Sequence, residues 1–354
     1  MSRVVMLSYE AGTGGAATYQ AHQINFLLTH GHQVVFVDER PEVTLAKVKQ
    51  PGALGLRVLT TPVWANCRQT MALLDETLAD ADMAVIALCN PGVLVRYYPW
   101  LVRQRRRGRR VALTMHSGML TMTTRRYLLE WAASVALLWL DYVTYVSWFT
   151  RRYWENRYPW TRLARAQVVP NGVDIPVELP VKQRGKNLRV GFVGRLLLEK
   201  DPRLYCQVAR LAQTKGLPFE FYLAGDGPLR PSLEQEYGSS IVWLPPNTKV
   251  SVVYSSIDLL MMTSPVENCP YVLLEAKSYG VPVVAASVGG IPEIVVSGAD
   301  SCLAAMRSPD ALLAALAEAG RSHEELVKGC LVNRTRYDVE QLCRVTWSAR
   351  GIMC

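Results

Sequence analysis

Two stretches of this 354-residue chain, 3–37 and 189–223, have the same order of features. Each starts with a short β-branched run and passes through a glycine turn (12–15 in the first, 194–195 in the second) into a helical stretch. Each then reaches a second strand after a further glycine. A strand, a glycine turn, a helix and a strand are how a doubly wound domain begins, with parallel strands covered by helices. The repeat therefore predicts two Rossmann-like α/β domains.

Further β-branched runs between amphipathic stretches extend both halves. We expect strands near 55–60, 83–88, 110–115, 141–146, 240–244, 257–262 and 281–286. The segment 170–187 carries prolines, glycines and charges without periodicity, which suits a hinge between domains. We therefore predict one domain over 1–178, a second over 179–336 and a final segment over 337–354.

Composition narrows the class of protein. Hydrophobic residues make up 50% of the chain and charged residues 19%, which excludes a disordered tail protein. The eight cysteines are scattered and no two form a C-x-x-C pair. We therefore expect neither a zinc site nor a disulfide framework, and a reducing cytosol. No apolar run reaches the roughly 18 residues that a membrane-spanning helix needs, so we expect a cytoplasmic protein.

The formal charge of +9 is concentrated in residues 96–165, here called the basic belt, which hold 14 arginines, 3 acidic residues and 14 aromatic residues. The densest parts are Arg103–Arg110 and Arg151–Trp160. One interpretation is peripheral attachment to the anionic inner face of a membrane. Each basic residue near lipid contributes about 1 kcal/mol, and Trp and Tyr suit the headgroup layer. The other interpretation is a solvated helix end and loop.

The basic belt also contains an apolar run, and its arginines could attract nucleic acid. We expect its apolar run, Trp131–Leu140, to be an ordinary core helix, because a strand follows it immediately. No nucleic-acid-binding motif accompanies the arginines. We therefore expect no nucleic-acid partner.

Two glutamates eight positions apart, Glu267 and Glu275, lie in a loop and in the helical run that follows it. The first lies in a proline-bearing loop, and the second lies in an apolar helical run that ends at Gly280. A strand-like run and the turn Gly289-Gly290 follow. A glutamate in an apolar helix is costly to bury without a partner, so the hydroxyl groups of a ligand are a natural candidate. Alternatively, Glu275 caps its helix or pairs with a surface lysine such as Lys277.

This order of two glutamates, helix, strand and Gly-Gly turn resembles the donor-sugar signature of the retaining family-4 glycosyltransferases (glycosyl transferases group 1), which have the GT-B fold. The resemblance is strongest over 189–296 and weak over 39–110. It implies two Rossmann-like domains facing across a cleft, the first binding an acceptor and the second a nucleotide-sugar donor. It also implies a last helix, 338–350, that crosses back to the N-terminal domain.

The resemblance assigns roles to five side chains. Arg195 and Lys200, after the first strand of the second domain, would grip the donor diphosphate and stabilise the leaving phosphate. Glu267 and His116 would orient the donor sugar, and Glu275 would hold the ribose hydroxyls. Fixed cations and helix N-termini can stabilise such a phosphate, so no metal and no cofactor besides the donor substrate is implied.

The resemblance also implies donor contacts that are largely made by the backbone. They fall at Gly14, Gly15, Gly194, Gly225, Gly227, Asn268, Cys269, Pro270, Gly289 and Gly290. At Gly225 and Gly227, a glycine turn that lets the backbone approach a ligand or a helix is the simpler explanation. Asp201 replaces the glycine that is usual in the family, and we expect this turn to differ slightly.

The expected function is transfer of a hexose-type sugar from a nucleotide diphosphate-sugar to the hydroxyl of a glycan, a lipid-linked acceptor or a small molecule, with retention of configuration. Two alternatives remain. The pattern Gly12-x-Gly14-x-x-Ala17, with Asp38 ending the second strand, fits a dinucleotide fingerprint and would indicate an NAD(P)-dependent oxidoreductase. That fingerprint explains none of 189–293. The other alternative is a catalytically silent GT-B scaffold that binds a partner or a lipid.

Overall fold

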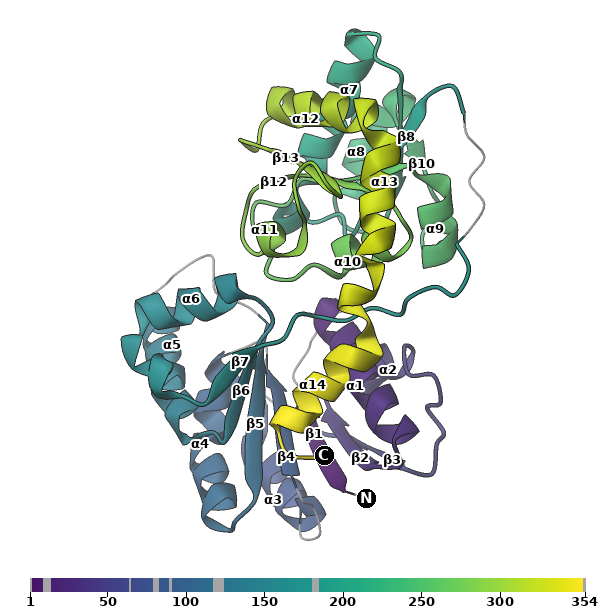
Figure 1. The fold of residues 1–354 in the computed structure, drawn as a ribbon. Helices are drawn as coiled ribbons and strands as arrows, with labels where there is room; N and C mark the ends of the chain where they lie inside the picture. Colours follow the sequence, from purple (N-terminus) through teal and green to yellow (C-terminus); the bar gives the residue numbers. More distant parts are fainter. Residues whose placement is uncertain are drawn as a thin grey trace. The chain divides into compact units, whose positions relative to one another are not determined.

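The computed structural model describes residues 2–8, 14–63, 65–78, 83–88, 91–116, 124–179 and 185–352. The chain forms two compact units, shown as a ribbon in Figure 1. Unit 1 comprises Met1–Gly172 with Val339–Cys354, and unit 2 comprises Val173–Asp338. The chain thus passes from unit 1 to unit 2 at 172–173 and returns to unit 1 at 338–339. The boundaries expected from the sequence were 178–179 and 336–337.

Seven parallel strands form the sheet of unit 1, in the order β3-β2-β1-β4-β5-β6-β7. They are β1 (Arg3–Ser8), β2 (Gln33–Asp38), β3 (Leu56–Thr60), β4 (Met83–Leu88), β5 (Arg110–Met115), β6 (Tyr142–Tyr145) and β7 (Ala166–Val168). The helices are α1 (Gly15–Thr29), α2 (Pro41–Leu45), α3 (Cys67–Thr77), α4 (Pro91–Arg106), α5 (Thr124–Ala136), α6 (Trp148–Arg157) and α14 (Val339–Ala349). Two 3₁₀ turns, η2 (Leu137–Trp139) and η3 (Pro159–Leu163), follow α5 and α6.

Both faces of this sheet are buried. Val5 and Leu7 of β1 belong to one apolar cluster, while Val4 and Met6 belong to a second cluster that includes Trp347 of α14. Successive side chains of a strand point to opposite faces, so a strand covered on both sides reads as a continuous apolar run. The C-terminal helix α14 therefore forms part of the core of unit 1.

Six parallel strands form the sheet of unit 2, in the order β10-β9-β8-β11-β12-β13. They are β8 (Leu188–Val193), β9 (Phe219–Ala224), β10 (Val242–Trp243), β11 (Leu259–Met262), β12 (Val283–Ala286) and β13 (Ser301–Ala304). The helices are α7 (Pro202–Thr214), α8 (Arg230–Tyr237), α9 (Val250–Ser256), α10 (Tyr271–Ser278), α11 (Ile291–Ile294), α12 (Pro309–Arg321) and α13 (His323–Val332). Three 3₁₀ turns complete the unit: η4 (Leu198–Lys200), η5 (Gly238–Ser240) and η6 (Arg334–Tyr337).

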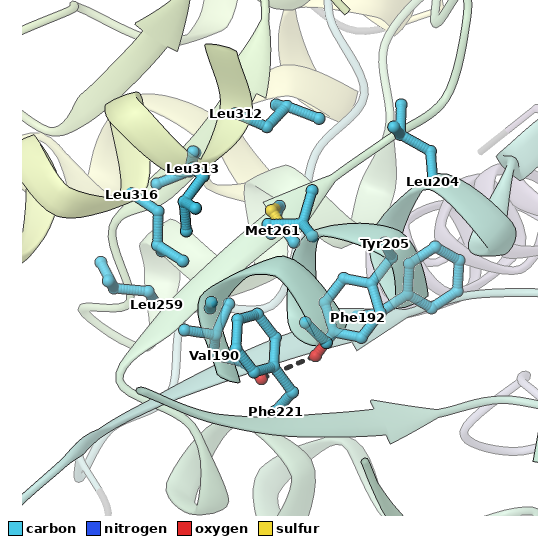
Figure 2. Close-up of a cluster of buried hydrophobic side chains, with 14 of the residues drawn as sticks. Val190, Phe192, Leu204, Tyr205, Phe221, Leu259, Met261, Leu312, Leu313 and Leu316 are labelled. Carbon is cyan, nitrogen blue, oxygen red and sulfur yellow. Dashed lines mark hydrogen bonds between the residues drawn. The ribbon is translucent and has the colours of Figure 1, made fainter. Parts of the chain in front are cut away.

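The core of unit 2 joins the sheet to α7 and α12 (Figure 2). Tyr205 of α7 is fully buried among strand side chains. Its hydroxyl donates to the carbonyl oxygens of Val190 (2.8 Å) and Tyr222 (2.7 Å). A buried phenol needs such acceptors, and these two tie the helix to the neighbouring strands β8 and β9.

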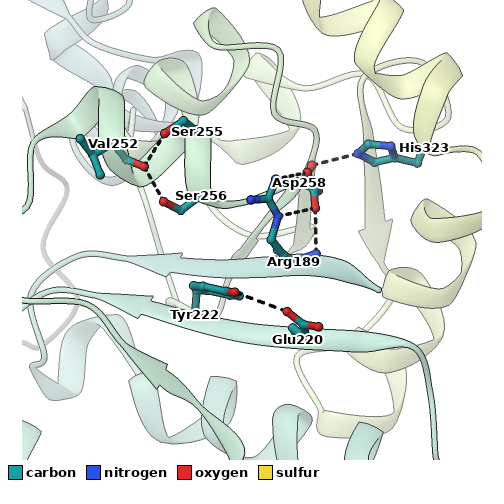
Figure 3. Close-up of polar contacts among 8 residues, drawn as sticks. All are labelled: Arg189, Glu220, Tyr222, Val252, Ser255, Ser256, Asp258 and His323. Carbon is teal, nitrogen blue, oxygen red and sulfur yellow. Dashed lines mark hydrogen bonds and ion pairs between the residues drawn. The ribbon is translucent and has the colours of Figure 1, made fainter. Parts of the chain in front are cut away.

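An ion pair joins the amino ends of the two central strands of unit 2 (Figure 3). The Nη2 of Arg189 lies 2.9 Å from Asp258 Oδ1, and its Nε and backbone N each donate to Oδ2 at 3.0 Å. The Nε2 of His323 lies 3.1 Å from the backbone oxygen of Asp258. These contacts hold together the amino ends of β8 and β11. The loops discussed below follow the carboxyl ends of the same strands.

Each sheet has its first strand near the centre, with β1 between β2 and β4 and β8 between β9 and β11. The strand order reverses there, and doubly wound sheets bind ligands at the carboxyl ends of strands beside such a reversal. The prediction of two doubly wound α/β domains is confirmed. Each of the seven further strands expected overlaps an observed one.

Two strands were missed because their sequences carry no strand signal. Strand β7 is only three residues long and has Gln167 at its centre. Strand β13, Ser301–Ala304, contains no β-branched residue. Both are edge strands of their sheets, so they are recruited by pairing with a neighbour rather than by their own propensity.

Candidate functional site

The loops at the carboxyl edge of unit 2 carry four of the predicted site residues. Arg195 and Lys200 follow β8, Glu267 follows β11, and Glu275 lies in α10. Because β8 and β11 are hydrogen-bonded neighbours, the loops that follow them begin side by side. The fold thus gathers residues that are some 70 positions apart in the sequence.

Lys200 and Glu267 form an ion pair. The Nζ of Lys200 lies 2.6 Å from Oε1 of Glu267, and the two side chains are 29% and 10% exposed. The sequence assigned these residues to different parts of a donor, and nothing in their spacing indicated that they touch. An ammonium group is therefore held at the switch point of this sheet, with a carboxylate beside it.

The loop that carries Lys200 is fixed by Asp201. Its backbone has φ 43° and ψ 58°, the left-handed region that favours glycine. Its carboxylate accepts from the backbone N of Leu204 at 3.2 Å as the N-cap of α7, and it also pairs with Arg307. Thr263 Oγ1 donates to the backbone oxygens of Lys200 (3.1 Å) and Asp201 (2.8 Å). A glycine-like turn is thus kept by these contacts.

Sequence reasoning missed Thr263 and Arg307. Thr263 directly follows β11, and Arg307 lies between β13 and α12. Thr263 follows a strand that neighbours β8, which is a signal that could have pointed to it. Arg307 follows the edge strand β13, and no sequence signal links it to the loop after β8.

Arg195 contacts a different partner. Its Nη2 lies 2.5 Å from Oε1 of Glu199, and both side chains are about half exposed. Exposed pairs of this spacing contribute only about 0.3–0.5 kcal/mol. A ligand can therefore displace Glu199 from the guanidinium at little cost. Among the described residues, Arg195 contacts neither Lys200 nor Glu267.

Glu275 contacts Tyr254, which lies in α9. The Tyr254 hydroxyl donates to Glu275 Oε2 at 3.1 Å and lies 2.9 Å from the backbone oxygen of Val272. Burial, and then the charge of Glu275, raises the pKa of Tyr254 well above its usual value. The phenol therefore stays protonated and serves as a fixed donor to this carboxylate.

The suggested alternative partner of Glu275 is engaged elsewhere. Lys277 is buried, and its Nζ lies 2.7 Å from Asp300 Oδ2 and 2.7 Å from the backbone oxygen of Ile294. The expectation of a surface lysine was wrong because residue 277 is on the face of α10 that packs against the unit's core. Lys277 therefore holds α10 in place rather than neutralising Glu275.

The glycines of these loops allow close approach of backbone segments. A Cβ on Gly225 would lie 1.9 Å from Gly194 O, and one on Gly227 would lie 2.7 Å from Leu196 O. The loop after β9 therefore packs directly on the loop after β8. Packing between loops therefore explains Gly225 and Gly227, whereas the sequence analysis expected the backbone to approach a ligand or a helix.

The turn Gly289-Gly290 supports Glu267 in the same way. A Cβ on Gly289, which has φ 59°, would lie 2.1 Å from Glu267 O, and the Gly290 N–H donates to that oxygen at 2.7 Å. The Gly290 N–H, which we expected to face a donor, is thus directed to the loop. Asn268, Cys269 and Pro270 lead from Glu267 into α10.

In unit 1, the predicted residues Gly14 and Gly15 stand at the start of α1, with Gly14 as its N-cap. No described residue lies within 4 Å of a Cβ built on Gly14, so packing against the described part of the chain does not explain this glycine. Gly12 of the dinucleotide fingerprint lies outside the described residues. Asp38 is buried, and its Oδ1 accepts from the backbone N of Arg40 at 3.1 Å.

His116 directly follows β5. Its ring packs edge-on against Tyr19, with centroids 4.5 Å apart. Its Nε2 is buried, and no hydrogen-bond partner for it lies among the described residues. Burial, and then the nearby Arg350, lowers the pKa of His116 to about 4. The imidazole is therefore neutral at physiological pH.

Arg350, just beyond α14, was missed by the sequence analysis. It is 3% exposed, and its Nη2 donates to the hydroxyls of Thr114 (2.7 Å) and Thr144 (3.2 Å). Thr114 in turn lies 3.0 Å from the Tyr19 hydroxyl. Within the described part of the chain no carboxylate pairs with this guanidinium. The residue that follows the C-terminal helix thus contributes a buried cation to the cluster of Thr114, Tyr19 and His116.

The basic belt divides into buried and exposed aromatic residues. Trp154 and Tyr158 are buried in the core of unit 1, whereas Trp131, Trp139 and Trp148 are each 45–49% exposed. The run 131–140 is only partly the core helix that was expected, because α5 ends at Ala136 and a 3₁₀ turn follows. Large apolar side chains therefore reach the surface among the arginines.

No cluster of three or more His, Cys, Asp or Glu side chains that could hold a metal ion occurs in the parts of the chain that the structure describes. Among those same parts, no helix has the length and apolar character to cross a bilayer.

Two family models match the chain. The model for "Glycosyl transferases group 1" matches residues 187–321, and the model for "Glycosyltransferase Family 4" matches residues 13–176. The first match lies within unit 2 and the second extends over most of unit 1.

Curated relatives match parts of the chain. WcaL of Salmonella typhimurium, provisionally named as a colanic acid biosynthesis glycosyltransferase, is 29% identical over 174 residues. The D-inositol 3-phosphate glycosyltransferase of Mycobacterium bovis is 31% identical over 152 residues. These matches cover 46% and 38% of this chain, and the chain spans only 43% and 32% of the relatives' own lengths.

Solved structures share the whole fold. HepE of Anabaena, in complex with UDP and glucose, has a TM-score of 0.79 at 16% identity, covering 99% of this chain and all of its own. The sucrose-phosphate synthase of Thermosynechococcus elongatus has a TM-score of 0.78 at 16% identity, covering 98% of each chain. This likeness shows the GT-B fold. The family matches over 13–176 and 187–321, one in each unit, are what identify the chain as a member of the group 1, family 4 glycosyltransferases.

Proposed function

We propose that this protein is a retaining glycosyltransferase that moves a sugar from a nucleotide diphosphate-sugar to an acceptor hydroxyl. The observation that carries the proposal is the pair of Lys200 and Glu267 at the carboxyl edge of β8 and β11, 2.6 Å apart. A cation and a carboxylate lie side by side there, which supports the proposal that Lys200 contacts the diphosphate and Glu267 contacts the sugar. Glu275, held by Tyr254, supplies a second carboxylate for the ribose.

In the proposed reaction the bond between the anomeric carbon and the terminal phosphate oxygen breaks, and the acceptor oxygen forms the new bond on the same face. Lys200 and Arg195 stabilise the charge that develops on the phosphate. The proton of the acceptor hydroxyl leaves with the nucleoside diphosphate. Two protein cations perform the neutralisation, so the proposed reaction requires no metal.

The Lys200–Glu267 pair has a further consequence for donor binding. An arriving diphosphate competes with Glu267 for the ammonium group, which frees a carboxylate oxygen where the sugar hydroxyls are proposed to lie. Glu267 is only 10% exposed, so the displaced carboxylate needs a new hydrogen-bond donor. A sugar hydroxyl provides one, and this couples binding of the phosphate to binding of the sugar.

In unit 1, neutral His116 is proposed to orient the donor sugar, and the loops of this unit are proposed to bind the acceptor. A neutral imidazole can donate or accept a hydrogen bond to a hydroxyl without adding charge. The complexes of HepE with UDP, glucose and UDP-glucose support a UDP-sugar as the first donor to test.

Peripheral attachment to the inner face of a membrane, through Arg103–Arg110 and Arg151–Trp160, is proposed for the basic belt. The exposed Trp148, with Arg151 lying 5.2 Å over its ring, supports this interpretation. A lipid-linked acceptor would then be presented at the surface where the enzyme is bound.

A thermal-shift screen of nucleoside diphosphates, nucleotide sugars and NAD(P)H tests the proposal, followed by an assay of sugar transfer from the ligand that stabilises the most. We expect nucleoside diphosphates and their sugars to raise the melting temperature and NAD(P)H to have no effect. Arg195→Ala and Glu275→Ala should lower the transfer rate, while Lys215→Ala, which removes an exposed charge from the same unit, should not. An oxidoreductase would respond to NAD(P)H alone, and a silent scaffold would transfer no sugar.

A further inference from the structure

A pocket lies in unit 1, away from the loop that carries His116. Its volume is about 530 Å³, and it is formed by the amino ends of β5 and β6 and by the residues that follow α14. Arg110 begins β5, and His116 follows the end of the same strand. Five residue steps at roughly 3.3 Å separate the first and last residues of this strand by about 17 Å. The pocket thus lies at the opposite end of β5 from His116, and Arg350, which donates to Thr114, is the residue that both share.

The wall of this pocket is strongly basic. Its lining includes Arg105, Arg110, Arg165 and Arg350, and its single acidic residue is Asp141. Arg105 pairs with Asp141, with Nε to Oδ1 at 3.3 Å. The one carboxylate of the pocket is therefore already engaged by one of the four arginines.

Two of the other guanidinium groups contact no carboxylate within the described residues. Arg110 Nη1 donates to the backbone oxygens of Arg350 (3.1 Å) and Gly351 (2.9 Å), which fixes one end of its fork. Arg165 lies over the ring of Tyr142, 5.6 Å from its centroid. Both side chains are thus held in place by neutral groups, and each keeps N–H donors that no acidic group satisfies.

The rest of the lining is apolar. Leu138, Leu140 and Leu163 contribute to the pocket, and Leu163 is 81% exposed. Trp139, between the first two of these leucines, is 45% exposed. A basic wall beside exposed apolar side chains matches a ligand that has a phosphate at one end and a hydrocarbon or glycerol part at the other.

We propose that this pocket binds the phosphate group of an anionic amphiphile, with Arg110 and Arg165 as its direct ligands. A planar guanidinium presents two parallel N–H donors that match two phosphate oxygens, which makes arginine the preferred side chain for such recognition. The site is separate from the proposed transfer reaction and stands or falls independently of it.

The test compares two charge reversals of equal size. Arg165→Glu removes a pocket ligand, and Arg162→Glu makes the same change in net charge at an exposed arginine three positions away that does not line the pocket. Binding of the full chain to vesicles of phosphatidylcholine with 20% phosphatidylglycerol is measured by sedimentation at fixed ionic strength. We expect Arg165→Glu to weaken binding at least tenfold more than Arg162→Glu does.

A second arm separates the two sources of phosphate. Glycerol phosphate and inorganic phosphate are titrated against the full chain and against both variants, with melting temperature as the readout. A phosphate-dependent rise in melting temperature that is lost only in Arg165→Glu supports the site. If the protein shows this rise but does not bind vesicles, the phosphate belongs to a soluble ligand. Equal losses in the two variants, or no binding of either kind of phosphate by the unmodified chain, would overturn the proposal. Arg165→Gln repeats the comparison without introducing a negative charge.

Discussion

The Nζ of Lys200 lies 2.6 Å from Oε1 of Glu267, although 66 residues separate them in the sequence. The pair exists because β8 and β11 are neighbours in the sheet and because Thr263 and Asp201 fix the loop on which Lys200 stands. The cation proposed to contact the diphosphate and the carboxylate proposed to contact the sugar are therefore held side by side.

Replacement of Lys200 tests its proposed contact with the leaving phosphate. We expect Lys200→Ala to lower kcat by about 10²- to 10³-fold, since the loss of one fixed stabilising group in a transition state has that effect. Lys200→Arg should retain part of the activity because it keeps the charge. Steady-state transfer kinetics measure both, and a kcat for Lys200→Ala within a few fold of the unmodified enzyme would be inconsistent with the role.

Asp201 allows a test of how the Lys200 loop is held. Asp201→Gly relieves a left-handed backbone that costs an ordinary residue about 1–2 kcal/mol, but it loses a helix cap worth about 1 kcal/mol. We expect this variant to be nearly as stable as the unmodified protein. Asp201→Ala keeps the strain and loses the cap, so it should be less stable by about 1–2 kcal/mol. Urea unfolding at pH 7 compares them, and equal stability of the two variants would contradict the account.

The lowered pKa of the half-buried His116 predicts a pH dependence of stability. Burial, and then the nearby Arg350, lowers the pKa of His116 from its ordinary 6.5 to about 4 in the folded protein. The unfolded state therefore binds more protons between these values, and stability falls as pH is lowered from about 6.5 to about 4. The loss of stability from this group is at most about 3.5 kcal/mol. His116→Gln should flatten that part of the profile in unfolding measurements from pH 7.5 to 4, and an unchanged slope would refute the assignment.

Arg350 offers a matched test in the same cluster. Arg350→Met keeps much of the side chain's apolar stem but removes the cation that lowers the pKa of His116. We expect this pKa, followed by NMR of the imidazole, to rise toward its usual value. Loss of the hydrogen bonds to Thr114 and Thr144 should also destabilise unit 1. A His116 pKa that stays near 4 would show that burial alone sets it.

The buried pair of Lys277 and Asp300 predicts a purely structural effect. Both side chains are 3% exposed or less, and removal of one partner leaves an uncompensated buried charge that costs about 3–5 kcal/mol. Lys277→Met should therefore lower the stability of the protein by that amount. Donor affinity of the folded fraction should stay unchanged, since Glu275 is held by Tyr254 rather than by Lys277. A selective loss of donor affinity would contradict this division of roles.

The parts of the fold that could be predicted from the sequence are those that depend on local sequence patterns. The glycine turns and apolar runs located both doubly wound sheets, and the spacing of Glu267 and Glu275 located one set of loops. Strands β7 and β13 could not be found, because edge pairing rather than propensity forms them. Thr263, Arg307 and Arg350 escaped notice because their contacts depend on which strands and helices become neighbours.

The most direct test of the central claim compares nucleoside diphosphates with the corresponding monophosphates by calorimetry. The panel of bases begins with UDP and UMP, and the base that binds best is then titrated against Arg195→Ala/Lys200→Ala. The account predicts that the diphosphate binds at least tenfold more tightly than the monophosphate, and that the double variant loses most of this difference. Equal affinity for both nucleotides, or a difference that survives in the double variant, would contradict the claim that these two cations grip the diphosphate.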